Sequence, residues 1–192
     1  SDWSSDVCSS DLGVGHRVRI VQGDIFKEDF SKASVVTLYL LDELNQQLRP
    51  TLLAMRPGTR VVSNTFGMGD WEPDQVIRVG SNTGYFWKVP AQVAGDWRVQ
   101  GLDRRGPVRL ALSQRYQRVG GTLTWGSKVQ PLLGARIDGA DLHFSFVTAD
   151  GQLQAVQVRV QADTMAGQWV TPYGMLDMQP EVVKVSAQRL GR

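Results

Sequence analysis

The sequence predicts a short α/β segment followed by an all-β antiparallel barrel or sandwich. Residues 34–66 begin with a run of apolar and β-branched side chains, continue with an amphipathic stretch and end with a second apolar run. This order predicts a strand, a helix and a strand. After residue 91, short segments alternate apolar and polar side chains and are separated by Gly, Asp and Pro. The strand–helix–strand order is typical of parallel strands joined by a helix. The alternation after residue 91 is typical of an antiparallel sheet with one apolar face.

Composition places the chain among ordinary globular proteins. Its 192 residues are 42% hydrophobic and 21% charged, with a net charge of +2. That charge is small and no Lys/Arg cluster is interleaved with aromatic residues, so a nucleic-acid partner is not expected. No apolar run approaches the roughly 20 residues that a membrane helix needs, so a membrane partner is not expected either. We expect a cytoplasmic location.

The first twelve residues, SDWSSDVCSSDL, differ in character from the rest of the chain. They lack apolar periodicity and the shape of a signal peptide, and they resemble a translated sequencing adapter. We predict that residues 1–12 are a foreign, disordered segment, because too few apolar side chains are present to offset an ordering entropy of about 1–2 kcal/mol per residue. Cys8, the only cysteine, lies in this segment, so no disulfide or cysteine–metal framework is expected.

The α/β segment begins with a predicted strand over residues 18–21, which leads into an acidic turn at residues 23–26. Residues 34–41 form a nearly continuous apolar run, as expected for a strand that is buried on both faces. Asp42 can cap a helix over residues 42–55. The apolar positions of that helix follow a spacing of three to four: Leu41, Leu44, Leu48, Leu52 and Met55.

Pro57-Gly58 ends the predicted helix, and residues 60–66 give the next strand. The strands over 34–41 and 60–66 are expected to be parallel neighbours or to lie one strand apart. Residues 67–82 predict a turn-rich loop, and residues 85–90 a further strand.

The motifs of this segment resemble those of class I S-adenosyl-L-methionine (AdoMet)-dependent methyltransferases. They are, in chain order, GDIF, VVTLYLL, N, LRP, PGTRVVSNTF and MGDW. The series is similar to bacterial proteins of this kind with an appended C-terminal β domain, and to protein-lysine methyltransferases with a YLL-type motif. The resemblance implies that residues 13–90 are the C-terminal half of a Rossmann-like methyltransferase sheet that binds AdoMet. It also implies that residues 91–192 are the appended β domain, with the boundary near Pro90.

Two parts of the family pattern are missing from the sequence, namely a glycine-rich turn after the first strand and an acid at the end of the second. Gly13-Val14-Gly15 is the only glycine pair upstream of the GDIF motif, and no predicted strand precedes it. We therefore interpret the chain as an N-terminally truncated methyltransferase fragment and expect it to be inactive as it stands.

The resemblance assigns cofactor contacts to the GDIF motif. Asp24 would accept a hydrogen bond from the adenine amino group, Ile25 would offer its backbone amide, and Phe26 would pack on the ring. The alternative is an acidic turn at a strand end with no ligand, since Asp is common in such turns.

Tyr39 and Asn45 occupy the place of the family's catalytic motif, at the carboxyl end of a strand, where ligands bind in open α/β sheets. Tyr39 would line the pocket between cofactor and methyl acceptor, and Asn45 would orient the acceptor. The alternative makes Tyr39 a core residue and Asn45 a residue of the first helical turn. Methyl transfer depends on alignment more than on a strong acid or base, so the lack of a catalytic dyad does not exclude it.

Asn64 and Phe66 lie at the end of the next predicted strand and Trp71 follows it, and all three would bind the substrate. An aromatic wall suits a cationic amine, and the family suggests a protein lysine or a small amine as acceptor. The alternative is that these aromatic residues only cover the sheet edge. His16 and His143 are far apart in sequence, so we expect no metal site.

Alternation defines the strands of the β domain and the side chains that fill it. Gly120-Gly121 and Asp150-Gly151 predict hairpin turns. We expect no helix over residues 140–162. The side chains predicted to point inward are Leu110, Leu112, Leu142, Phe144, Val156, Val158, Val160 and Val185. The alternative function for the chain is a non-enzymatic β-barrel binding or structural module beside an inert α/β segment.

Overall fold

The computed structural model describes residues 13–104, 106–170 and 182–191. The prediction for residues 1–12 lies outside these residues. The chain divides into two compact units, Ser1–Phe30 and Ser31–Arg192.

In the first unit, residues 13–30 contain a single turn of 3₁₀ helix, η1 (Gly15–Arg17), and no strand. The predicted strand over residues 18–21 is therefore wrong, and Val18, Ile20 and Val21 are exposed. A strand is stable only beside hydrogen-bonded neighbours, and residues 13–30 supply no second strand.

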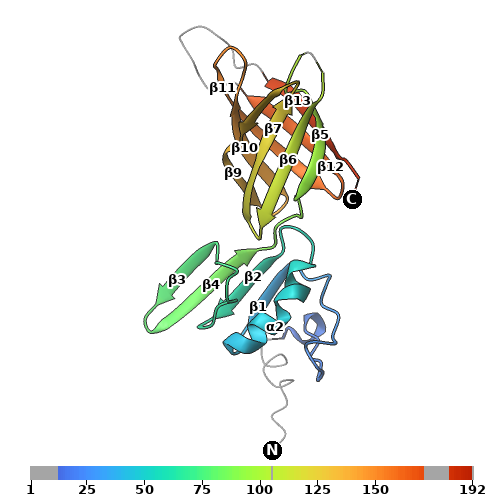
Figure 1. Cartoon of the computed structure of the whole chain (residues 1–192). Coiled ribbons are helices and arrows are strands. Elements are labelled where there is room, and N and C mark those ends of the chain that lie inside the picture. Colours follow the sequence, from blue (N-terminus) through green and yellow to red (C-terminus); the bar gives the residue numbers. More distant parts are fainter. Residues whose placement is uncertain (1–12, 105, 171–181, 192) are drawn as a thin grey trace, which may run out of the picture. The chain divides into compact units, whose positions relative to one another are not determined.

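The second unit begins with a four-stranded sheet in the order β1-β2-β4-β3 (Figure 1). Its strands are β1 (Val35–Leu38), β2 (Arg60–Asn64), β3 (Gln75–Val79) and β4 (Asn82–Lys88). Helix α2 (Asp42–Leu53) connects β1 to β2, and these two strands pair in parallel from Val35↔Arg60 to Leu38↔Ser63. The predicted parallel pair joined by a helix is confirmed. β4 is antiparallel to both β2 and β3.

Strand β1 differs from the prediction of a long, doubly buried strand over residues 34–41. It has four residues and lies at the sheet edge, and Val35 is 40% exposed. An edge strand has one neighbour, so its other edge stays open. Strand β3 was not predicted, because residues 67–82 are rich in turn residues and β3 is exposed along its whole length.

Helix α2 buries Leu48 and Leu52 of the apolar face that its spacing predicts, whereas Leu41 lies before the helix and is exposed. Its N-cap residue is Leu41, and no side chain caps it. Asp42 is the first helical residue and accepts a hydrogen bond from Gln46, so its predicted role as cap is wrong. The helix also ends two residues before the predicted Met55.

The remaining strands form a nine-stranded antiparallel sheet in the order β6-β5-β13-β12-β11-β10-β9-β7-β8. Pairing of β6 with β7 closes this sheet, so that eight of the described strands form a barrel and β8 is an extra strand on β7 (Figure 1). The strands are β5 (Gly95–Gln100), β6 (Val108–Arg115), β7 (Arg118–Trp125), β8 (Lys128–Pro131), β9 (Leu133–Asp138), β10 (Asp141–Val147), β11 (Leu153–Gln161), β12 (Thr164–Val170) and β13 (Val182–Arg189).

The barrel interior confirms the predicted alternation. All eight side chains predicted to point inward are buried, and residues 140–162 contain no helix. Trp97, Leu123 and Phe146 are among the further buried side chains of this core. The predicted domain boundary near Pro90 stays a prediction, although the chain passes from the first sheet to the barrel between β4 and β5.

One of the two predicted hairpin turns is wrong. Asp150-Gly151 is a turn, with Gly151 at φ +84°. Gly120-Gly121 instead lies inside β7, and the hairpin reverses at Tyr116-Gln117. A Cβ at Gly121 would lie 2.1 Å from the Ala111 carbonyl oxygen, so this glycine serves the close approach of β6 and β7.

Candidate functional site

The parallel pair β1–β2 brings several predicted site residues to one edge of the first sheet. Tyr39 directly follows β1, and Asn64 ends β2. The pairing ends at Leu38↔Ser63, and Tyr39 and Asn64 are the residues that directly follow this last pair in each chain segment. The carboxyl ends of parallel strands are where open α/β sheets bind ligands, so this edge is the candidate site.

Asn45 lies beneath this edge, in the first turn of α2, and is fully buried. Its Nδ2 atom is 3.1 Å from Ser63 Oγ, 3.2 Å from the Phe66 carbonyl oxygen and 3.2 Å from the Gly67 carbonyl oxygen. An amide group has two N–H donors, so the three acceptors share them. Asn45 therefore joins the helix to the end of β2 and to the chain that follows it.

The Asn45 side-chain oxygen is buried as well, and no described residue donates a hydrogen bond to it. A buried carbonyl without a donor is costly. Asn45 is thus a residue of the first helical turn, as the alternative predicted, and its predicted role of orienting the acceptor stays a prediction.

Thr65 has an unusual backbone conformation at the same edge. Its φ is +68°, and the Phe66 amide donates to the Asn64 carbonyl oxygen over 2.8 Å, which defines a γ-turn. A positive φ is a genuine outlier for a β-branched residue, and such outliers cluster at functional sites. The sequence does not predict this turn, because Ser63-Asn64-Thr65 contains no glycine, the residue that ordinarily adopts a positive φ.

Two aromatic side chains are open to solvent at this edge. Tyr39 is 85% exposed and Phe66 is 37% exposed. The alternative that makes Tyr39 a core residue is therefore wrong.

Trp71 differs from the other predicted substrate-binding residues because it is fully buried. Its indole Nε1 donates to Gln117 Oε1 over 3.0 Å, and its carbonyl oxygen accepts from Trp87 Nε1 over 2.9 Å. The Trp71 and Trp87 ring centroids are 5.8 Å apart. Contrary to the prediction, Trp71 presents no open surface with which to line an acceptor pocket.

The GDIF motif lies in the first unit and forms an exposed turn. The Phe26 amide donates to Asp24 Oδ1 over 3.0 Å, and the Lys27 amide donates to the Asp24 carbonyl oxygen over 2.8 Å. Lys27 Nζ lies 3.4 Å from Asp24 Oδ2. Ile25 and Phe26 are both exposed beside this carboxylate.

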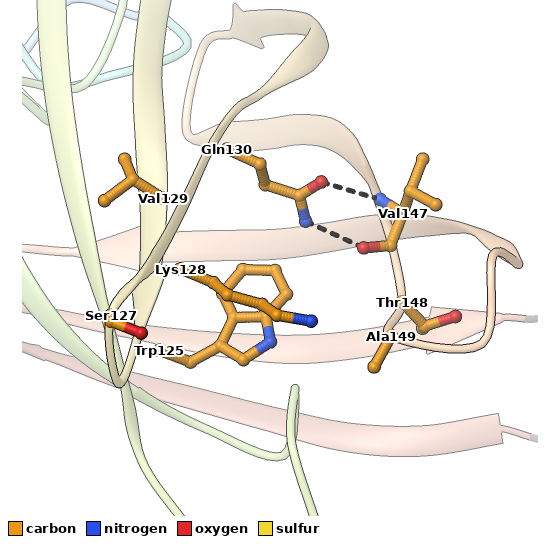
Figure 2. A pocket seen from close by; sticks show the side chains of 8 residues that line it. All are labelled: Trp125, Ser127, Lys128, Val129, Gln130, Val147, Thr148 and Ala149. Carbon is orange, nitrogen blue, oxygen red and sulfur yellow. Dashed lines mark hydrogen bonds between the residues drawn. The ribbon is translucent and has the colours of Figure 1, made fainter.

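The barrel has a cavity of about 480 Å³ that the sequence did not predict (Figure 2). The Gln130 amide crosses one end of it, with Nε2 donating to the Val147 carbonyl oxygen over 2.8 Å and Oε1 accepting from the Val147 amide over 3.4 Å. Its lining residues are Trp125, Ser127, Lys128, Val129, Gln130, Val147, Thr148 and Ala149.

The structure describes residues 13–104, 106–170 and 182–191 of the chain. They contain no group of three or more His, Cys, Asp or Glu side chains that could hold a metal ion. They also contain no helix with the length and apolar character needed to cross a membrane.

Comparison with known proteins points to one family for the first part of the chain. Residues 3–75 match the model of the ANTKMT methyltransferase domain. A protein-lysine N-methyltransferase of Saccharolobus islandicus (strain REY15A) is 47% identical over 68 residues, which are 35% of this chain and 42% of that protein. The predicted resemblance to class I AdoMet-dependent methyltransferases is thereby confirmed.

A solved structure is also similar to this methyltransferase-like chain. It is an RNA methyltransferase from Salinibacter ruber in complex with S-adenosyl-L-homocysteine, 40% identical, and the match covers 52% of this chain and 63% of that one with a TM-score of 0.45. The chain thus spans less than half of the curated relative and under two thirds of the solved one. Every predicted site residue lies within the matched residues 3–75, and the barrel strands lie beyond them.

Proposed function

We propose that this chain carries the methyl-acceptor side of an AdoMet-dependent methyltransferase whose acceptor is a protein lysine. The observation that carries this proposal is the 47% identity over 68 residues to a protein-lysine N-methyltransferase. The candidate edge adds a chemical reason, because exposed aromatic rings at Tyr39 and Phe66 are suited to a cationic amine.

The chemistry that AdoMet supplies is an electrophilic methyl group on a sulfonium. The GDIF turn fits the adenine end of such a molecule, since it presents an exposed carboxylate next to exposed apolar side chains. We assign Asp24 to the adenine amino group, the Ile25 amide to the ring edge and Phe26 to the ring face.

The residues of the candidate edge orient the acceptor. Tyr39 lies between cofactor and acceptor in this proposal, and Asn64 and Phe66 contact the acceptor amine. Asn45 is buried, so its role is to position the backbone of Phe66 and Gly67 and not to touch substrate. The edge binds the acceptor as a cation, and the amine has to lose its proton to solvent before its lone pair can be aligned with the methyl group. Positioning then supplies most of the rate.

The test is methyl transfer by the full-length protein to a lysine-containing protein, measured by mass spectrometry of the modified peptide. Phe66→Ala is expected to raise the KM for the acceptor and to leave AdoMet binding unchanged. Val129→Ala, an exposed apolar truncation in the barrel, is the control and is expected to leave both unchanged. Transfer to a lysine-free acceptor alone would contradict the assigned substrate.

The alternative function, a binding barrel beside an inert α/β segment, is favoured by the cavity around Trp125. The two functions are separable by variant. Phe66→Ala is expected to weaken methyl transfer and to leave a barrel ligand bound, whereas Trp125→Ala is expected to weaken the binding of a barrel ligand.

A further inference from the structure

The turn between β6 and β7, residues 115–118, contacts the β2–β3 loop, residues 65–74, which follows the candidate edge. Asp70 is the centre of this contact. Its Oδ2 accepts from Arg115 Nη2 over 2.9 Å, and its Oδ1 accepts from the Tyr116 hydroxyl over 3.0 Å. Arg49 of α2 reaches the same carboxylate over 2.5 Å. One side chain of the loop thus joins the helix and the barrel.

Trp71 and Glu72, which follow Asp70 in the loop, also contact the β6–β7 turn. The Tyr116 ring stacks on Trp71, with centroids 6.1 Å apart and planes 25° apart. Gln117 accepts from the Trp71 indole over 3.0 Å and donates to the Glu72 carbonyl oxygen over 2.6 Å. Arg118 forms an ion pair with Glu72. All four residues of the turn therefore have partners in the β2–β3 loop.

Tyr116 occupies a backbone position that favours glycine. Its φ is +54°, at the first of two turn residues between the paired Arg115 and Arg118. Two-residue hairpins use Gly or Asn where φ is positive, because a Cβ is disfavoured there. The ring and hydroxyl of Tyr116 both contact the β2–β3 loop, through Trp71 and Asp70.

The loop is held from its other side by α2. Asn45 contacts the Phe66 and Gly67 carbonyl oxygens, and Arg49 Nη1 contacts the Met68 carbonyl oxygen over 2.8 Å. The helix therefore holds the start of the loop and the β6–β7 turn holds its middle, directly after the exposed Phe66.

We propose that the β6–β7 turn is a positioning element for the methyl-acceptor edge, through which the barrel holds the β2–β3 loop and so fixes Asn64 and Phe66. The acceptor role rests on the proposed function, and the holding of the loop does not. Tyr116, Gln117 and Arg115 are positioning residues, since none of them lies at the candidate edge itself. The barrel thereby acquires a role in acceptor binding.

The deciding variant is Tyr116→Gly, which removes the ring and hydroxyl while suiting the positive φ of the turn. The chain offers a matched control, because Ala162 also has a positive φ, +51°, in the two-residue turn between β11 and β12. Ala162→Gly relieves the same kind of backbone strain and makes no change in the β2–β3 loop.

Hydrogen exchange of residues 66–72 is the first measurement. We expect Tyr116→Gly to speed exchange of these amides by about tenfold or more, with barrel strands unchanged, and Ala162→Gly to leave them at the wild-type rate. Equal exchange in Tyr116→Gly and wild type would overturn the proposal.

Steady-state methyl transfer by the full-length protein is the second measurement. Tyr116→Gly is expected to raise the acceptor KM with little change in the AdoMet Kd, and Tyr116→Phe, which keeps the ring, is expected to recover most of the wild-type KM. An unchanged acceptor KM beside a faster-exchanging loop would overturn the acceptor role. Absence of methyl transfer in the wild type would overturn the proposed function, and faster loop exchange would still show that the turn holds the loop.

Discussion

Asn45 and Ser63 meet in the buried layer between α2 and β2, where the Asn45 amide nitrogen lies 3.1 Å from the Ser63 hydroxyl oxygen and both residues are fully covered. The same nitrogen serves the Phe66 and Gly67 carbonyl oxygens. A single amide therefore determines how the end of β2 turns into the β2–β3 loop, at the place where Thr65 adopts its positive φ.

Replacing Asn45 by Ala is expected to lower the free energy of unfolding. The substitution leaves buried acceptors without a donor, at about 1–3 kcal/mol for each group left unpaired. Urea unfolding would measure the change. Gln47→Ala, on an exposed position of the same helix, is the control and should shift the midpoint little. A loss as small as that of the control would mean that water satisfies these carbonyl groups and that Asn45 does not hold the loop.

Gly121→Ala is expected to disrupt the barrel, and Gly120→Ala is its matched control one residue away. A Cβ at Gly121 would lie 2.1 Å from the Ala111 carbonyl oxygen, whereas at Gly120 its nearest contact is the Ser113 hydroxyl at 3.4 Å. Backbone must move in the first case and not in the second. Thermal unfolding of both variants should show a large loss for Gly121→Ala only. Equal Tm values would contradict the close approach of β6 and β7.

Much of this fold follows from periodicity. The alternation of apolar side chains predicted the inward residues of the barrel, and the strand–helix–strand order predicted the parallel β1–β2 pair. Periodicity does not report the number of neighbours that a strand has. This is why periodicity predicts a strand of the sheet over residues 18–21, where the described structure has no strand. It is also why β1 is predicted to be buried although it lies at an edge.

The candidate site was predictable in part for a related reason. Motif resemblance located Tyr39, Asn45, Asn64 and Phe66, which the structure brings to one edge. It could not reveal that Trp71 is used by the barrel, because its partner Gln117 lies 46 residues away. The strain at Thr65 and Tyr116 was equally hidden, since neither is a residue type that favours a positive φ.

The contact between Asp70 and the β6–β7 turn is expected to weaken in acid. Hydrogen bonds from Arg115 and then Tyr116, together with Arg49, lower the pKa of Asp70 from 3.8 to about 2. A folded-state pKa below the ordinary value means that the carboxylate contributes stability above about pH 4, and that this contribution is lost as the pH falls through about 2. Asp70 is half-exposed, so solvent screens part of the effect.

The stability difference between wild type and Asp70→Asn, measured by urea unfolding, should therefore be constant from pH 7 to about pH 4 and should shrink toward pH 2. Asp96→Asn is the control for a surface aspartate paired with one arginine, Arg109, within the barrel. Asp96→Asn should leave the rate of hydrogen exchange in residues 66–72 unchanged, whereas Asp70→Asn should increase that rate. A difference for Asp70→Asn that grows as the pH falls would contradict the lowered pKa.

AdoMet binding by the 192-residue chain is expected to be weak. In the proposed function, Asp24 is assigned to the adenine and the Tyr39 edge to the acceptor, and the sequence contains neither the glycine-rich turn nor the second acid of the family pattern. The lack of two or three charge-assisted hydrogen bonds, at roughly 1.5–3 kcal/mol each, weakens binding by several orders of magnitude.

Calorimetry would measure the AdoMet affinity directly on the 192-residue chain and on the full-length protein. Micromolar binding by the chain alone would refute the expectation. In the full-length protein, Asp24→Ala should weaken binding by roughly ten- to a hundredfold, and Glu43→Ala, which removes the same charge from an exposed position on α2, should not. If both variants bind as the wild type does, Asp24 has no part in holding the adenine, and the GDIF motif is only an acidic turn.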